Sequence, residues 1–111
     1  VNRSGGQYRV SCTPGENVNG HCPSVDVMML SVADQVGRNA IGILLTGMGA
    51  DGANGMVAMR NAGAFTVAQD ERTCVVYGMP KAAWERGGAD RLVGLGHVAA
   101  VSLNPNIRQA Q

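Results

Sequence analysis

The sequence predicts an α/β fold with a largely parallel sheet. Two observations lead to this prediction. Apolar segments of strand length alternate along the chain with segments whose apolar residues recur at helical spacing. The run Ala40–Leu45 is continuously apolar and rich in Ile and Leu, as in a parallel strand that is buried on both faces.

Composition limits the function classes that this chain could belong to. Its 111 residues suffice for one domain, and a net charge of +1 creates no strong field for nucleic acid or anionic lipid. No apolar run approaches the ~20 residues of a membrane-spanning helix, and no signal peptide opens the chain. We therefore expect a cytoplasmic protein without membrane insertion. Three cysteines at unrelated spacings predict neither a disulfide framework nor a zinc site, and we expect no cofactor.

The first half of the chain contains signals for one helix between two strands. Ser24 can cap a helix, and Asp26 lies in its first turn, where the helix dipole favours an anion. Gly37 can end this helix in a left-handed conformation. The expected elements are a half-exposed strand over Gln7–Cys12, a turn-rich loop over Thr13–Gly20, a helix over Ser24–Val36 and a strand over Ala40–Leu45.

The second half repeats the alternation of helix and strand. Pro80 is suited to the first position of a helix, because that position needs no N–H donor. The expected elements are a helix over Ala53–Ala62 with Met56, Met59 and Ala62 inward, a strand over Ala64–Ala68, a short apolar segment over Cys74–Tyr77, a helix from Pro80 to Gly87-Gly88, a strand over Arg91–Gly94, a helical stretch over His97–Leu103 and a frayed tail over Asn104–Gln111.

The loop after the first buried strand has the features of a functional loop. In an open parallel sheet, ligands bind beyond the carboxyl ends of the strands, where helix N-termini present free N–H groups. One interpretation is a dinucleotide-binding fingerprint, because Gly47, Gly49 and Gly52 match GxGxxG and Asp70 follows about 20 residues later.

Asp51 opposes that interpretation, since its carboxylate would repel a pyrophosphate bound at the same N–H groups. A carboxylate in front of a helix N-terminus stays ionised, as an aspartate that orients a catalytic histidine must. Asp51 could also simply cap the helix that starts near Ala53. Spacing alone leaves capping, catalysis and nucleotide binding open.

Several segments in order resemble one enzyme family. They are residues 23–27 (PSVDV), 44–55 (LLTGMGADGANG), 63–70 (GAFTVAQD), 74–80 (CVVYGMP) and 87–95. Together they resemble the C-terminal part of the catalytic domain of chemotaxis protein-glutamate methylesterases of the CheB type. The resemblance implies a doubly wound, Rossmann-like three-layer domain, and residues 1–111 would be its C-terminal part, incomplete at the N-terminal side and with no second domain.

The resemblance also implies an activity and its residues. Members of the family hydrolyse methyl esters on glutamates of chemotaxis receptors, with glutamine deamidation as a further reaction, and use a Ser-His-Asp triad. Through the TGMGxDG motif, Asp51 would be the triad aspartate, and the backbone N–H of Met48 would donate to the oxyanion. The Met48 side chain would pack against the histidine.

The catalytic serine and histidine of the family have no counterpart in these 111 residues. None of the five serines (Ser4, Ser11, Ser24, Ser31 and Ser102) lies in a GxSxG elbow. Neither His21 nor His97 matches the family's catalytic histidine. The chain also begins at Val1 without an initiator Met, so we expect a truncated domain that is inactive alone.

The resemblance and the truncation together predict the partners. The family implies methylated chemoreceptor cytoplasmic domains as substrates and a receiver domain upstream. Removing leading strands from a parallel sheet exposes an edge, so we expect oligomerisation through that edge. A non-enzymatic interaction domain therefore remains an alternative to the enzyme.

Overall fold

The computed structural model describes residues 1–11 and 24–103 of the chain. The strands are β1 (Asn2–Ser4), β2 (Gln7–Arg9), β3 (Ile41–Leu44), β4 (Phe65–Gln69) and β5 (Arg91–Val93); the α-helices are α1 (Val25–Gln35), α2 (Ala53–Asn61), α3 (Met79–Glu85) and α4 (Val98–Leu103); and the 3-10 helices are η1 (Gly37–Asn39), η2 (Glu71–Thr73) and η3 (Leu95–His97).

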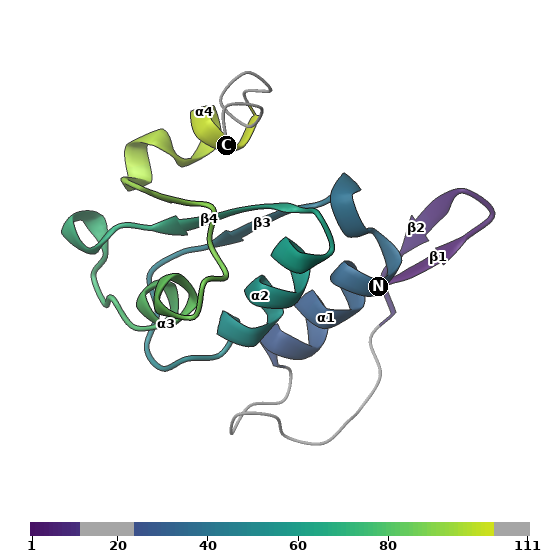
Figure 1. Ribbon diagram of the computed structural model, residues 1–111, viewed down its shortest axis with the longest axis horizontal. Coiled ribbons are helices and arrows are strands. Elements are labelled where there is room, and N and C mark those ends of the chain that lie inside the picture. The colour runs from purple at the N-terminus through teal and green to yellow at the C-terminus, as the bar shows by residue number, and fades with distance from the viewer. Residues whose placement is uncertain (12–23, 104–111) are drawn as a thin grey trace.

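A parallel sheet confirms the predicted fold class. The strand order is β3-β4-β5, with Ile41 opposite Phe65 and Val67 opposite Arg91. α2 connects β3 to β4, and α3 connects β4 to β5. β1 and β2 form a separate antiparallel hairpin that projects beside α1 (Figure 1). Within the predicted strand over Gln7–Cys12, the structure has β2 only over Gln7–Arg9, as one arm of this hairpin, and all three residues are exposed rather than half-exposed.

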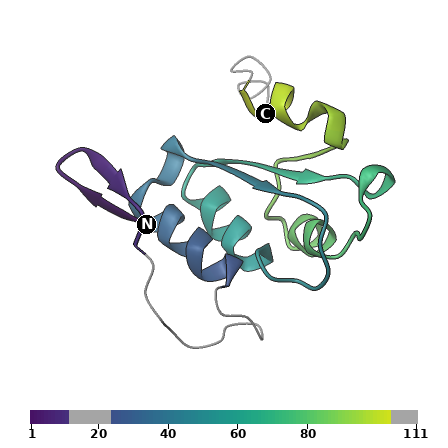
Figure 2. The same cartoon turned by 180° about the vertical axis from the view of Figure 1, so that it is seen from behind.

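Helices lie on both faces of the sheet, as Figures 1 and 2 show from opposite sides. α1, α2 and α3 lie on one face, where Met29, Met56 and Ala83 join Leu44 and Ala68 in the larger core. α4 lies on the other face, in a smaller core of Phe65, Val67, Val93, Val98 and Val101. The three layers agree with the expected doubly wound architecture.

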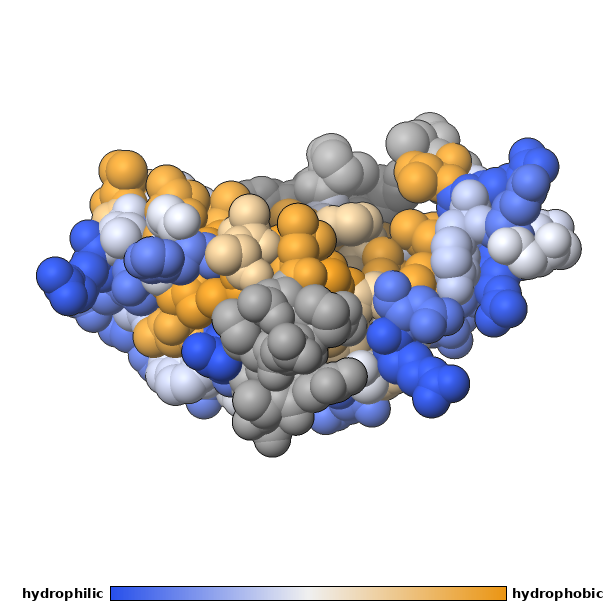
Figure 3. Space-filling model, turned by 90° about the horizontal axis from the view of Figure 1, so that it is seen from above, coloured by the Kyte–Doolittle hydropathy of each residue, from blue (hydrophilic) through white to orange (hydrophobic). Residues whose placement is uncertain are grey.

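Two predictions about burial in the sheet and in α2 are wrong. β3 is not buried on both faces, because Ile43 is 38% exposed. β3 is the edge strand of the described sheet, and α4 packs on β4 instead. Figure 3, which views the molecule from above, shows several hydrophobic patches at the surface. Ala62 is exposed rather than on the inner face of α2, since it is the C-cap at the end of the helix.

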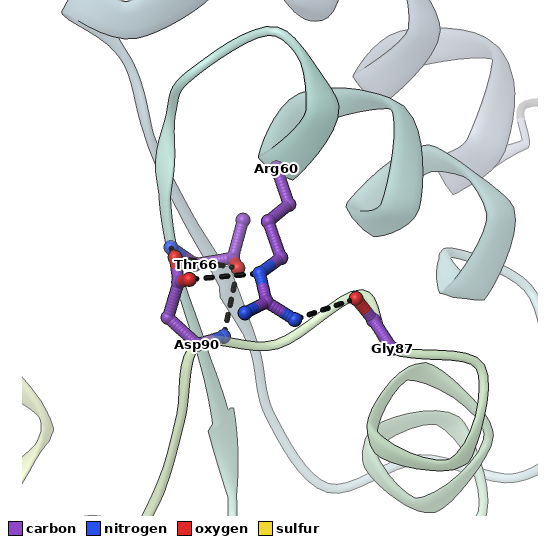
Figure 4. A network of polar contacts seen from close by, with 4 residues as sticks. All are labelled: Arg60, Thr66, Gly87 and Asp90. Carbon is purple, nitrogen blue, oxygen red and sulfur yellow. Dashed lines mark hydrogen bonds and ion pairs between the residues drawn. The ribbon is translucent and has the colours of Figure 1, made fainter. Parts of the chain in front are cut away.

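A polar network fixes the far end of the sheet (Figure 4). The Asp90 carboxylate accepts from the Thr66 N–H at 2.9 Å and pairs with the Arg60 guanidinium at 2.8 Å. A second Arg60 nitrogen donates to the Gly87 carbonyl at 2.9 Å. The network connects the end of α2 to β4 and to the segment before β5. It therefore holds these elements together at the end of the sheet opposite the loop after β3.

Some sequence-based predictions lie outside the described residues. These are the loop over Thr13–Gly20, the positions of Cys12, His21 and Cys22, and the tail over Asn104–Gln111.

Candidate active site

The loop after β3 requires glycine at several positions and is hydrogen-bonded to the segment before α3. Gly49 and Gly52 have φ angles of +89° and +97°, which side chains other than glycine rarely adopt. The Gly47 N–H donates to the Val76 carbonyl at 3.0 Å, and the Gly47 carbonyl accepts from the Gly78 N–H at 3.1 Å. A Cβ atom at Gly78 would lie 2.7 Å from the Gly47 oxygen, so only glycine permits this approach.

The predicted triad aspartate, Asp51, is buried against the N-terminus of α1. Its Oδ1 accepts from the Ser24 hydroxyl at 2.9 Å and from the Asp26 N–H at 3.1 Å. Its Oδ2 accepts from the Val25 N–H at 2.8 Å. The residue is 6% exposed. Three donors and the positive end of a helix stabilise the ionised carboxylate and fix its orientation.

These contacts correct the two capping predictions. Asp51 does not cap α2, whose N-cap is Gly52 without a side-chain bond. It caps α1, whose N-terminal residues lie 25 or more positions away in the sequence. Ser24 is the N-cap of α1 by position, yet its side chain makes no capping bond and donates to Asp51 instead. A carboxylate accepts two backbone N–H groups where a hydroxyl of Ser24 would accept one.

The second carboxylate of the site, Asp26, makes the reverse connection. Its Oδ1 accepts from the Gly52 N–H at 3.0 Å and from the Gly55 N–H at 2.7 Å, both at the N-terminus of α2. From sequence, Asp26 was only a favourable charge in the first turn of its own helix. No local pattern signals a bond to a helix that begins 27 residues later, although both aspartates lie in the family-like segments.

Met48 lies on the outer side of the same loop, and its side chain is 80% exposed. Its N–H donates to no atom of the residues that the structure describes. The predicted oxyanion donor and the predicted triad aspartate are therefore three residues apart on one loop, the first open to solvent and the second buried.

Gln69 joins the carboxyl ends of two strands. Its side-chain oxygen accepts from the Thr46 N–H at 2.8 Å, and its side-chain nitrogen donates to the Thr73 carbonyl at 2.8 Å. Gln69 is 1% exposed. Burial raises the pKa of the Cys74 thiol, against a hydrogen bond from Thr46 that lowers it. Burial also raises the pKa of Tyr77, so both groups are neutral near pH 7.

The geometry does not support the dinucleotide interpretation. The N–H groups of Gly52 and Gly55 that would receive a pyrophosphate already donate to Asp26. Asp70, the acidic residue of that fingerprint, accepts from the Thr73 N–H at 3.1 Å and from its hydroxyl at 2.7 Å. Asp70 therefore caps η2.

The described residues contain neither a membrane-spanning helix nor a cluster of metal ligands. Within residues 1–11 and 24–103, no helix has both the length and the apolar character to cross a bilayer. The same residues contain no cluster of three or more His, Cys, Asp or Glu side chains that could hold a metal ion.

Known proteins resemble this chain over most of its length. Residues 2–101 match the family model of CheB methylesterases. A protein-glutamate methylesterase/protein-glutamine glutaminase of Syntrophotalea carbinolica is 67% identical over 99 residues, which are 89% of this chain and 28% of the relative. A relative of the same name in Syntrophomonas wolfei is 55% identical over 98 residues, or 29% of its length.

A solved structure has the same fold. The CheB methylesterase catalytic domain of Thermotoga maritima matches with a TM-score of 0.74 at 34% identity, covering 78% of this chain and 46% of that domain. The chain thus spans less than a third of the two curated relatives and about half of the crystallised domain.

Proposed function

Because the chain belongs to the CheB methylesterase family, we propose that residues 1–111 form the C-terminal part of a protein-glutamate methylesterase catalytic domain. The observation that carries the proposal is the Asp51 carboxylate, which is buried in the family-like loop and oriented by three donors. An aspartate that steers a histidine needs this combination of negative charge and fixed direction.

In the proposed reaction, Asp51 acts on a histidine outside this chain. A serine attacks the methyl ester of a glutamate side chain, and the histidine takes the serine proton and passes it to departing methanol. Water then attacks the acyl-enzyme and releases the glutamate. Asp51 stays ionised throughout and stabilises the imidazolium, while the Met48 N–H donates to the oxyanion.

The substrates of the complete protein would be methylated cytoplasmic domains of chemoreceptors, with glutamine side chains as a second substrate. Glutamine is proposed as a second substrate because the names of the relatives include protein-glutamine glutaminase. We further propose control by an upstream receiver domain and a cytoplasmic location. By itself the chain should be inactive, because no GxSxG elbow occurs in its sequence.

A chimera tests the proposal directly. Residues 2–101 would replace the matching segment of the Syntrophotalea carbinolica methylesterase, and methanol release from a methylated receptor fragment would be measured. We expect the chimera to be active and Asp51→Asn to lower kcat by about 10³- to 10⁴-fold. Asp34→Asn is the matched control, because Asp34 is an exposed carboxylate on α1. A fully active Asp51→Asn chimera would refute the proposal.

We expect Met48→Ala to lower kcat much less than Asp51→Asn. Met48→Ala retains the backbone N–H, so its kcat should fall less than tenfold in the same chimera. A loss as large as that of Asp51→Asn would show that the side chain, not the backbone donor, is what the reaction needs.

We also propose that the isolated chain self-associates through β3. Within the described residues β3 is an edge strand, and beside it lies an open apolar cavity of about 250 Å³, lined by Met28, Met29, Val32, Ile41, Gly42, Ile43 and Met59. An edge strand with apolar neighbours pairs readily with another chain, and a lysine on the edge prevents it. Sedimentation velocity should show a dimer or larger species that Ile43→Lys returns to monomer. A monomeric wild-type chain would contradict this.

A further inference from the structure

Asp26 forms hydrogen bonds with Asp51 and with Gly52, the next residue of the loop. Its N–H donates to the Asp51 carboxylate at 3.1 Å, and its own carboxylate accepts from the Gly52 N–H at 3.0 Å. Asp26 thus contacts both the side chain of one loop residue and the backbone of the next. This closed ring of contacts restrains the rotation of the Asp51 carboxylate as well as the position of its Cα atom.

The hydrogen bonds of Gly47 hold the start of the loop, and Asp51 lies four residues further on. Gly49 and Gly52, which flank Asp51, both have positive φ angles, and glycine passes between backbone conformations with little steric resistance. Asp26 supplies the external restraint from a site that is 3% exposed. Its Oδ1 accepts from both the Gly52 N–H and the Gly55 N–H, and these two bonds fix the start of α2 relative to α1.

The packing of α1 against α2 is adapted to this contact. A Cβ atom at Gly55 would lie 2.5 Å from the Met29 Cβ and 3.2 Å from the Asp26 Oδ1. Glycine at this position allows the Asp26 carboxylate to reach the first turn of α2. The two helix N-termini therefore exchange their caps, with Asp51 on α1 and Asp26 on α2.

We propose that Asp26 is a positioning residue of the esterase reaction, an inference that rests on the proposed function of Asp51. Asp26 touches neither substrate nor the reacting atoms. It fixes the direction from which Asp51 meets the histidine, through its acceptor oxygen on Gly52 and Gly55. A displacement of about 1 Å in a catalytic group can lower the rate about 100-fold.

A purely structural cap would behave differently. Its loss would reduce the amount of folded protein, and activity would fall in proportion with an unchanged pH profile. Loss of positioning lowers kcat in the folded protein and leaves KM unchanged. It also weakens the support that Asp51 gives to the imidazolium, so the pKa of the histidine falls and the acid limb of kcat/KM moves to lower pH.

The experiment uses the chimera with Asp26→Ala and Asp26→Asn, and the folded fraction is measured by urea unfolding. We expect Asp26→Ala to lower kcat about 10- to 100-fold with KM within about twofold of the parent. The acid limb should move down by about half a pH unit to one unit. Asp26→Asn keeps an acceptor oxygen and should recover kcat to within about threefold of the parent. Asp34→Ala on the same helix is the control and should match the parent.

Three results would overturn the inference. The first is an activity of Asp26→Ala that falls only in proportion to the folded fraction, with the acid limb of kcat/KM at the same pH as in the parent. The second is an Asp26→Asn variant whose kcat is as low as that of Asp26→Ala. The third is a folded Asp26→Ala variant with the kcat of the parent. If Asp26→Ala does not fold, Asp26→Glu decides, because its carboxylate is one methylene further out. A lowered kcat with a shifted limb supports positioning, and parental kcat contradicts it.

Asp51→Asn separates this inference from the proposed function. Full activity of Asp51→Asn would overturn both. An inactive Asp51→Asn beside a normal Asp26→Ala would overturn only the role of Asp26.

Discussion

Replacing Gly55 by alanine sets two effects of opposite sign against each other. In an isolated helix, alanine would stabilise by about 0.8–1.0 kcal/mol relative to glycine. In this protein the new Cβ would lie 2.5 Å from the Met29 Cβ, whereas carbon atoms pack at about 3.5–4.0 Å. α1 and α2 would have to separate by about 1 Å, and overpacking of this kind costs about 1–3 kcal/mol.

The separation would also stretch the bond between Asp26 and the Gly55 N–H, which is 2.7 Å long. A hydrogen bond to a charged group contributes about 1.5–3 kcal/mol. We therefore expect Gly55→Ala to lower the free energy of unfolding by about 2 kcal/mol, and the midpoint of urea unfolding by about 1–2 M.

Unfolding of the 111-residue chain, followed by far-UV circular dichroism, measures this change. Gly96→Ala is the matched control, because a Cβ at Gly96 meets no atom within 4 Å. That variant should be neutral or stabilised by up to about 1 kcal/mol. A Gly55→Ala chain as stable as the parent, or more so, would refute the close packing of the two helix N-termini.

Three further experiments test the polar network of the sheet and the environment of Cys74. Asp90→Ala should destabilise the chain by about 2–3 kcal/mol in the same unfolding experiment, because it leaves the buried Thr66 N–H without its acceptor. Arg60→Ala should cost less than about 1 kcal/mol, since the Arg60 side chain is 44% exposed; equal losses would contradict this. Cys74, in a background with the other cysteines changed to serine, should react with iodoacetamide more slowly than a free thiol at pH 8, and faster as pH rises. Its raised pKa leaves less thiolate at pH 8, so a rate equal to that of the free thiol would refute the shift.

Local signals in the sequence sufficed for the order of helices and strands. The apolar run before the glycine loop predicts β3, and Pro80 in the first turn predicts α3. Gly37 marks the end of a helix, where it has a positive φ angle. These features depend on residues close together in the chain, so propensity and periodicity determine them. The family-like segments likewise predicted the loop that contains Asp51.

Only the tertiary structure decided what the aspartates contact. From sequence, Asp51 was a candidate cap for the helix that follows it and Ser24 for its own helix. In the folded protein, Asp51 caps α1, Asp26 caps α2, and Ser24 donates to Asp51. The reason is that α1 and α2 pack with their N-termini side by side, across the short contact that Gly55 permits. Contacts between residues so far apart in the chain follow from helix packing, which no local pattern encodes.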